Sequence, residues 1–467
     1  MKKTIGIQIG PDSFVDEGIE KTLDILQEKG AINTIYLSTF TYDRGITGRQ
    51  IPGKSFPDHG VQASDVPYFH GGNYATPHAQ YYKNTAIKGD QLRAPDFGKL
   101  DIVAELLPAA KKRGMDVICS IQDGFNYPAD VPFMKDYAEV DLQGRKSGAM
   151  CFFQPDVSEF WKAVTTDLCS SYNIDGVLLF NERNGPLLNA IGVSHAQGID
   201  SAKVTCFCDQ HERAAKAYGI DFQRAKEGYR KLNQYVQNSL NAQRPSDGYY
   251  VEFARLLLEY PEIMAYNQLF DAGKHQVLKD VYKAAKAVRK NLQVGFHIEH
   301  TNSFNPLFRA SRSYEDLAQM ADFLKVVVYN NCGGERYRSF IRNITSTVFR
   351  DVPPEEMLSI NNHLLNYANE APLDELPMAG LSPDYVMRET QRAKAGVNGK
   401  CLILPGIDVD IPTGEKSRKA STDDTYAATL AAFKGGADGV ILSRKYSEMM
   451  LANLSAAGRA VRDAEKL

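Results

Sequence analysis

The chain has 467 residues, a formal net charge of −3 and a pI near 6.3. Hydrophobic residues make up 43 % and charged residues 24 % of it, which is the composition of a folded globular protein with ample material for a core. There is no basic field and no Lys/Arg-rich run interleaved with aromatic residues, which argues against a nucleic-acid partner. No run approaches the roughly 18 apolar residues of a membrane span, and the first residues lack the apolar core of a signal peptide. We therefore expect a cytoplasmic protein without membrane association.

Short apolar runs rich in Val, Ile and Leu recur along the chain, and most precede a helix-like segment. They cover residues 4–9, 34–39, 116–121, 176–181, 293–298, 323–329, 401–405 and 439–443. Continuous rather than alternating hydrophobicity indicates strands that are covered on both faces, as in a parallel sheet wrapped by helices. Eight such units predict the α/β class and a closed (β/α)8 TIM barrel.

Helix boundary signals support this alternation at several points. The segment with Ile19, Leu23 and Leu26 on one face follows two acidic residues at 16 and 17 and stops at a glycine. A Ser-Pro pair at 382 and 383 predicts an N-cap followed by proline at the first helical position. The run Ser-Thr-Asp-Asp from 421 to 424 predicts the start of the last long connecting helix.

The connections after the second and the fourth strands are too long for plain βα loops. The second of these is mostly helical from Cys208 to about Leu240. We expect one catalytic barrel over residues 1–467, with long insertions in these two loops and a helical subdomain inserted over residues 183–272. Long ordered excursions on this side of a barrel are where substrate selectivity is usually built.

A buried strand at residues 176–181 leads directly into Glu182 and Arg183. The Gly185-Pro186 pair that follows prevents an immediate helix that Glu182 could cap. Barrel enzymes keep their active sites at the carboxyl ends of the strands, so Glu182 is the first candidate for a catalytic acid/base. This assignment requires Glu182 to face the barrel axis and Arg183 not to neutralise it.

Glycoside hydrolysis needs a second carboxylate besides the acid/base. Asp408 is the first candidate, because it follows the seventh strand within a stiff Gly/Pro frame, and Glu299 is the second. Asp410 lies in the same frame as Asp408, where capping of the loop is the alternative role. A raised pKa of the general acid would follow from burial in a loop-covered cleft beside the second carboxylate.

Aromatic, amide and basic side chains at the strand ends and in the second βα loop suit a sugar ligand, because aromatic rings stack on sugars and amides bond to hydroxyl pairs. The alternative is that they pack the loops onto the barrel. The substrate-binding candidates are Arg183, His70, Asn73, Tyr74, His78, Gln122, His297, Glu299, Tyr329, Asn330, Asp410, Arg444 and Tyr446. No phosphate-cradling or dinucleotide-binding glycine motif is present.

A metal site is the main competing interpretation. His297 and Glu299 share one strand face, and His70, His78, Asp408 or Asp410 could complete an N/O site of the kind that sugar isomerases use. Seven cysteines, odd in number and scattered, suit buried free thiols in a reducing compartment.

A second arrangement of metal-binding residue types lies within one short stretch. Cys206, Cys208 and His211 are spaced more tightly than the usual zinc motif, and no fourth ligand is evident in the sequence. We interpret these cysteines as structural residues at a helix start. The sequence therefore predicts neither a metal nor a cofactor.

The chain resembles the glycoside-hydrolase-like (β/α)8 proteins, in particular the group described as hypothetical glycosyl hydrolases. The resemblance covers nearly the full length. Its carriers are residues 70–78 (HGGNYATPH), 174–176 (IDG) leading to Glu182, 206–208 (CFC), 405–408 (PGID) and 443–448 (SRKYSE). Asn181-Glu182 is also similar to the Asn-Glu pair with which clan A glycosidases end strand four, and this implies an acid/base role for Glu182.

The chain departs from two glycosidase patterns. Clan A enzymes carry a glutamate nucleophile at the end of strand seven, where this chain has aspartates. Leu178 and Phe180 stand where the chitinase strand-four motif has aspartates, which disfavours substrate-assisted chemistry. The resemblance therefore implies a fold and a reaction class but no particular sugar.

These observations predict a glycoside hydrolase that acts on a carbohydrate with Glu182 and Asp408 and without a cofactor. One alternative is a metal-dependent sugar isomerase, epimerase or lyase centred on His297, Glu299 and Asp408. Another is a non-catalytic carbohydrate-binding barrel. The exposed aromatic loops could equally serve a contact in a homo-oligomer.

Overall fold

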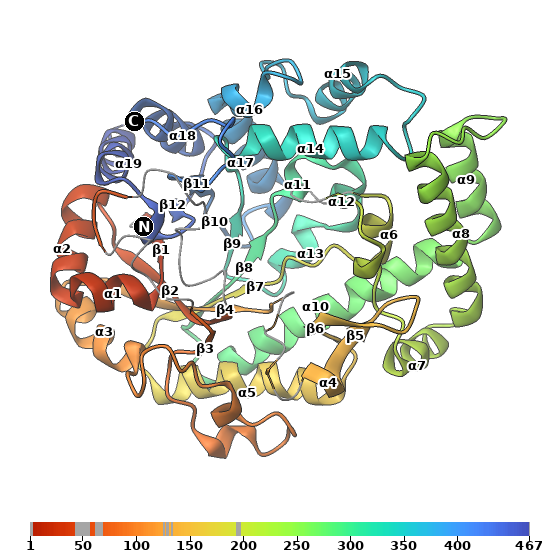
Figure 1. Cartoon of the computed structure of the whole chain (residues 1–467). Helices are drawn as coiled ribbons and strands as arrows, with labels where there is room; N and C mark the ends of the chain where they lie inside the picture. The colour runs from red at the N-terminus through yellow and green to blue at the C-terminus, as the bar shows by residue number, and fades with distance from the viewer. Residues whose placement is uncertain are drawn as a thin grey trace.

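A parallel sheet curls around the centre of the molecule in the computed structural model, which describes residues 3–42, 57–60, 69–124, 127, 130–131, 134–192 and 198–466 (Figure 1). Its parallel strands are neighbours in the order β10-β9-β8-β7-β4-β2-β1-β12-β11. They are β1 (Thr4–Ile9), β2 (Thr34–Tyr42), β4 (Asp116–Gln122), β7 (Gly176–Phe180), β8 (Gln293–Ile298), β9 (Phe323–Val326), β10 (Leu402–Ile403), β11 (Gly406–Asp408) and β12 (Gly439–Ser443).

The seventh barrel position is a strand that is interrupted at Pro405. Its first part, β10, pairs with β9, and its second part, β11, pairs with β12. Because β10 and β11 are consecutive in the chain, they join the two ends of the sheet. The carbonyl of Pro405 accepts a hydrogen bond from the backbone of Ile441 at 2.9 Å across this junction. The predicted (β/α)8 barrel is confirmed.

The apolar runs of the sequence became the barrel strands because those strands are covered on both faces. β1, β8 and β12 have the predicted bounds, whereas β2 is longer and β9 shorter than predicted. Side chains on the inner face form a compact plug within the barrel. It consists of Tyr36, Ile118, Leu178, Phe323, Leu404 and Ile441. A larger apolar cluster fills the space between the strands and the helices.

Helices surround the sheet on its outer side (Figure 1). They include α1 (Pro11–Glu17), α2 (Ile19–Gly30), α3 (Ile102–Lys112), α5 (Pro155–Ser171), α10 (Glu262–Val288), α13 (Tyr314–Ala318), α17 (Pro383–Val397), α18 (Thr422–Lys434) and α19 (Leu451–Ala464). In the described ranges, none of the helices is both long and apolar enough to cross a bilayer.

The predicted helix caps at Ser382 and Ser421 are confirmed. The side chain of Ser382 accepts a hydrogen bond from the backbone of Tyr385, and Ser421 forms a reciprocal capping box with Asp424. The segment predicted to open at residues 16 and 17 differs, because α1 ends there and α2 begins one residue after Gly18. Gly18 has a φ of 84°, a conformation that glycine adopts more readily than residues with a side chain. The helical conformation is therefore interrupted at Gly18, between α1 and α2.

Further elements lie in the connections. The helices are α4 (Met134–Tyr137), α6 (Pro186–Ala190), α7 (Asp209–Ala217), α8 (Phe222–Leu240), α9 (Tyr249–Glu259), α11 (Thr301–Phe304), α12 (Pro306–Ser311), α14 (Gly333–Thr345), α15 (Pro354–Leu365) and α16 (Leu376–Ala379). The 3-10 turns are η3 (Ala79–Tyr82), η4 (Gly89–Leu92), η5 (Ser201–Lys203) and η6 (Tyr446–Glu448). The short strands are β3 (Gly71–Asn73), β5 (Ala138–Val140) and β6 (Lys146–Met150).

Three of these connections build the surroundings of the strand ends. In the connection after β2, β3 pairs antiparallel with β2, while residues 43–56 and 61–68 lie outside the described part of the chain. The connection after β4 carries the β5–β6 hairpin, which the sequence did not predict. After β7, helices α7, α8 and α9 gather at one side of the barrel (Figure 1). An independent helical subdomain over residues 183–272 stays a prediction.

Candidate active site

A cavity of about 430 Å³ lies at the carboxyl ends of the barrel strands, a volume within the range of small-molecule sites. Side chains from most strands contribute to its wall. They include Gln8, Ser38, Phe40, Ser120, Gln122, Phe180, Glu182, His297, Glu299, Tyr329 and Arg444. The β5–β6 hairpin adds Glu139, Ser147 and Ala149 to one side of this wall.

Glu182 reaches into this cavity from the end of β7. Leu178 packs in the plug inside the barrel and Phe180 packs against it, and Glu182 continues the same two-residue alternation. Its side chain is 39 % exposed, and its Oε1 lies 2.6 Å from Nε2 of His297 on the neighbouring strand β8. The catalytic candidate therefore faces the barrel axis, as the sequence interpretation requires.

Arg183 also contributes to the cavity wall, but its side chain is buried and bonded to other partners. Its Nη2 donates to Oε1 of Glu139 and to the carbonyl of Met150, both at 2.7 Å, and its Nη1 lies 3.3 Å from Oδ2 of Asp123. The guanidinium also stacks over the ring of Phe152 at 3.8 Å. Its charge is thus committed to partners other than Glu182, and the second requirement is met.

Behind Glu182, the buried pair His297 and Lys325 extends toward the barrel interior. Nζ of Lys325 lies 3.4 Å from Nδ1 of His297 and donates to the hydroxyl of Tyr329 at 2.9 Å and to Gln8. Burial lowers the pKa of His297, and the charge of Lys325 lowers it further. A neutral imidazole that accepts from Lys325 at Nδ1 carries its proton at Nε2, so it donates a hydrogen bond to Glu182.

Sequence reasoning missed Lys325. The signal was a single lysine within the otherwise apolar run of residues 323–329, at a position that alternation places on the inner face with Phe323. Burial lowers the pKa of Lys325 to about 7, with the carboxylate of Glu182 acting against this shift and Arg444 adding to it. The interior of the barrel below the cavity therefore contains a titratable amine.

Glu299 is a second carboxylate in the cavity wall. It is 5 % exposed and forms an ion pair with Lys274 of α10 at 2.5 Å. Burial, reinforced by the charge of Arg312, lowers the pKa of Lys274 to about 8. Oε2 of Glu299 is buried and has no hydrogen-bond partner among the described residues.

Asp408 occupies a different place from the one predicted. It is fully buried and does not line the cavity. Its Oδ2 accepts from the backbone N–H of Cys332 at 2.8 Å and its Oδ1 from that of Ile411 at 3.2 Å. Asp410 similarly accepts from the backbone of Met450 and from Asn453. Both acids thus hold loops beyond β11, which is the capping role considered for Asp410.

The structure brings only part of the predicted binding set to the cavity. The lining includes Gln122, Arg183, His297, Glu299, Tyr329 and Arg444. Outside it lie His70, Asn73, Tyr74, His78, Asn330, Asp410 and Tyr446. His70, Asn73, Tyr74 and His78 belong to the connection that contains β3, which pairs antiparallel with β2.

The misplaced residues have local roles in the second βα connection. Tyr74 is buried and donates to Asp96 at 2.6 Å, and Oδ1 of Asn73 accepts from the backbone of Ala75. His70 lies 3.1 Å from Asp130, and Nδ1 of His78 lies 2.8 Å from Asp167. The first two contacts hold the connection together and the last two attach it to other parts of the molecule, which is the packing role that the sequence left open.

Two further differences concern residues that follow β9 and β12. Tyr446 is buried with its hydroxyl 3.4 Å from Glu17, and Asn330 is buried as well. Arg444 lines the cavity, and its guanidinium pairs with Glu448.

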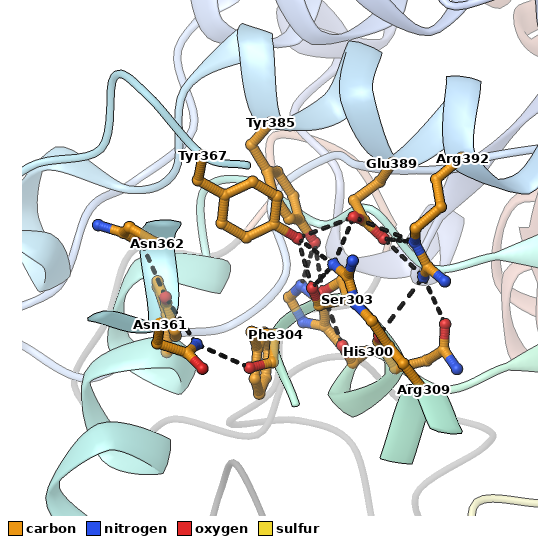
Figure 2. Close-up of polar contacts among 12 residues, drawn as sticks. His300, Ser303, Phe304, Arg309, Asn361, Asn362, Tyr367, Tyr385, Glu389 and Arg392 are labelled. Atoms are coloured by element: carbon orange, nitrogen blue, oxygen red, sulfur yellow. Dashed lines mark hydrogen bonds and ion pairs between the residues drawn. The ribbon is translucent and has the colours of Figure 1, made fainter. Parts of the chain in front are cut away.

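His300 is a cavity residue to which the sequence assigned no role. Its Nε2 lies 3.0 Å from the hydroxyl of Tyr385 and its Nδ1 lies 3.2 Å from Nη1 of Arg336. Figure 2 shows the buried network behind it, in which Tyr385 and Tyr367 meet near Ser303. This network also contains Arg309, Glu389 and Arg392. Through Tyr385, this network holds the imidazole of His300 in position.

The residues of the predicted N/O metal site do not converge. His297 contacts Glu182 and Glu299 contacts Lys274, although both line the same cavity. The other candidates are bonded elsewhere, as described above. Among the described residues, the one group with metal-ligand geometry consists of cysteines and a histidine outside the cavity.

Comparison with known proteins identifies the fold. No protein-family model matches the chain, and no curated protein matches it. Several solved structures similar to it are glycoside hydrolases. The chain has the barrel fold of glycoside hydrolases.

Three of these structures give the extent of the likeness. α-L-Fucosidase isoenzyme 2 from Paenibacillus thiaminolyticus has a TM-score of 0.51 and 13 % identity, over 99 % of this chain and 49 % of the fucosidase. The β-galactosidase from the haloarchaeon Halorubrum lacusprofundi has a TM-score of 0.53 and 12 % identity, over 99 % of this chain and 58 % of the galactosidase. The PgaB (BpsB) glycoside hydrolase domain from Bordetella bronchiseptica has a TM-score of 0.50 and 11 % identity, with 99 % of both chains covered. The chain thus spans about half the length of the fucosidase.

Proposed function

We propose that the protein hydrolyses a glycosidic bond in a carbohydrate by a two-carboxylate mechanism, with Glu182 as the general acid/base. The observation that carries the proposal is the position of Glu182. Its carboxyl group extends from the fourth barrel strand into the cavity, bonded to His297 and with Arg183 paired elsewhere. The neighbours' fold supports the same reaction class.

In this mechanism, Glu182 donates its proton to the oxygen of the departing group and later takes a proton from water. The Nε2–H of His297 holds the carboxyl group in place and stabilises the carboxylate that forms after proton transfer. Lys325 acts through His297, because its contact with Nδ1 fixes the tautomer that donates to Glu182. His297 and Lys325 are therefore positioning residues.

Glu299 is the better candidate for the second carboxylate. It lines the cavity and has one oxygen without a hydrogen-bond partner among the described residues, whereas both oxygens of Asp408 are bonded to backbone amides. The ammonium group of Lys274 lies beside Glu299, which would act as the nucleophile or as the base for water, while Glu182 faces an uncharged imidazole. Two carboxylates in contrasting surroundings suit the two roles.

The cavity wall supports a sugar as the ligand. Gln122 and Ser120 supply amide and hydroxyl groups, and Phe180 and Tyr329 supply aromatic surface beside them. Polar groups fix the orientation of the hydroxyls while the rings cover the apolar faces of the sugar.

The test uses aryl glycosides of several sugars whose leaving phenols differ in acidity. Glu182→Gln should reduce kcat/KM by roughly 100-fold or more for poorly acidic phenols and much less for activated ones, because only the former need a proton. Glu299→Gln should abolish turnover with all leaving groups. Glu356→Gln replaces an exposed glutamate on α15 and serves as the matched control, with unchanged activity.

Each opposing result has a defined meaning. If Asp408→Asn lost more activity than Glu299→Gln, Asp408 rather than Glu299 would be the second carboxylate. A Glu182→Gln variant that keeps full activity toward poor leaving groups would refute the acid/base assignment. Sugar binding by the wild type and by Glu182→Gln alike, without hydrolysis of any substrate, would support a non-catalytic binding barrel.

A further inference from the structure

Four metal-ligand side chains from two distant parts of the chain meet at one point beside the cavity wall. We call them the Cys3His cluster; its members are Cys151, Cys206, Cys208 and His211. Cys151 directly follows β6, and the other three precede or begin α7. Their ligand atoms all lie within 4.8 Å of one another. Cys151 is the fourth ligand that the sequence did not supply.

The separations fit a tetrahedral ion. Zinc–sulfur bonds of about 2.3 Å and zinc–nitrogen bonds of about 2.0 Å place two sulfurs about 3.8 Å apart and a sulfur about 3.6 Å from a nitrogen. In the structure, Sγ of Cys208 lies 3.6 Å from Sγ of Cys151 and 3.8 Å from Nδ1 of His211. Sγ of Cys151 lies 3.1 Å from the same nitrogen. The observed distances lie on either side of the tetrahedral values.

The surroundings of the cluster suit metal-bound thiolates. The backbone N–H of Val140 points at Sγ of Cys206 at 3.3 Å, a contact that stabilises negative charge on sulfur. Cys151 and Cys206 are buried, so water cannot stabilise thiolates there and a bound cation would have to do so.

The imidazole of His211 is fixed for coordination. The side chain is fully buried, and the ring of Phe153 lies 4.7 Å away in an edge-to-face contact. Its Nδ1 faces the sulfurs, while Nε2 has no hydrogen-bond partner among the residues that the structure describes. Nδ1 is therefore the nitrogen of this buried imidazole that can bind a cation together with the three sulfurs.

We propose that the Cys3His cluster binds one zinc ion in a closed structural site. Three sulfurs and one nitrogen complete the tetrahedron, so no position remains open for water or substrate. Binding replaces the thiol protons, which pass to solvent, and involves no change of oxidation state. This site is separate from the cavity carboxylates and does not depend on the proposed function.

The ion would join two loops that form one wall of the cavity. Residues of the β5–β6 hairpin already contact the segment before α7, where the backbone of Phe207 donates to Val140 at 2.7 Å (Figure 1). Met150 and Thr205 each precede a ligand, and both contact the Arg183–Glu139 pair. Zinc at this junction would therefore hold the partners of Arg183 in place.

Elemental analysis of the full chain, purified without chelator and dialysed against metal-free buffer, tests the proposal. We expect about one zinc per chain in the wild type and below about a tenth in Cys208→Ser, since loss of one of four ligands weakens such sites strongly. Cys332→Ser and Cys119→Ser replace buried cysteines outside the cluster and should keep the zinc.

Measurements on the wild type alone keep the test decisive if a variant fails to fold. Cobalt added to the apoprotein should give the visible bands of a tetrahedral site and thiolate-to-metal charge transfer. Removal of zinc should expose additional thiols to a thiol reagent and lower the Tm. Zinc-free folded protein with unchanged Tm, retention of zinc by Cys208→Ser, or a disulfide between Cys151 and Cys208 in mass spectrometry would each overturn the proposal.

Discussion

Replacement of Lys325 by methionine should change how the stability of the barrel depends on pH. Burial lowers the pKa of this lysine from 10.5 to about 7 in the folded protein, with Glu182, His297 and Arg444 as its titratable or charged neighbours. Between pH 7 and pH 9, the unfolded chain keeps the amine protonated while the folded protein releases the proton. The unfolded state thus binds more protons, and the stability of the wild type rises with pH.

The magnitude follows from the two pKa values. Integration of the proton difference from pH 7 to pH 9 gives a gain of about 2 kcal/mol in the free energy of unfolding that Lys325→Met lacks. Denaturant unfolding of both proteins at the two pH values measures it. Groups that Lys325 does not contact, including Lys274, ionise alike in both proteins and cancel in the difference, whereas His297 belongs to the same coupled group as Lys325.

A control separates this effect from a general change of charge. Lys279→Met removes an exposed lysine from α10 and should leave the pH dependence of stability as in the wild type. If Lys325→Met and the wild type differ by the same free energy at pH 7 and pH 9, the amine titrates alike in both states and the reasoning is refuted.

Three further changes test the packing around the site. Gly176→Ala should destabilise the protein by about 3 kcal/mol in thermal unfolding, because a Cβ there would lie 1.9 Å from the carbonyl oxygen of Gln293 in the next strand; no loss would contradict this close approach. Glu389→Gln should cost about 3 kcal/mol in urea unfolding, since it leaves Arg309 without its buried carboxylate; a change below about 0.5 kcal/mol would refute the importance of the network. Burial raises the pKa of Asp123 to about 6, so the wild type loses stability as pH rises from 4 to 6, and Asp123→Asn should abolish that part of the slope; an unaltered slope would exclude Asp123 as its source.

The barrel itself could be predicted from the sequence, and the reason is physical. Strands covered on both faces need continuous apolar residues, which makes β1, β8 and β12 visible as runs. The β5–β6 hairpin lacks this signal, because one strand has three residues and the other begins with polar ones. Its pairing depends on packing against the rest of the molecule.

The site could be predicted only where the side-chain direction follows from the strand. Glu182 continues the inward alternation of β7, so the sequence alone predicts that its side chain faces the barrel axis. The strand that leads to Asp408 is broken at Pro405, and the amide that binds the carboxylate comes from Cys332, in another loop. No local pattern encodes that contact. The convergence of Cys151 on Cys208 is likewise a property of the folded chain.

The pairing of β1 with β12 places Thr4 beside Gly439. On the ribosome, β1 is made long before β12, its neighbour on this side. Until β12 has been made, β1 has only β2 to pair with, and its other edge remains open to other chains. The barrel can therefore close only after β12 has been synthesised, and the open edge of β1 needs protection from association with other chains until then.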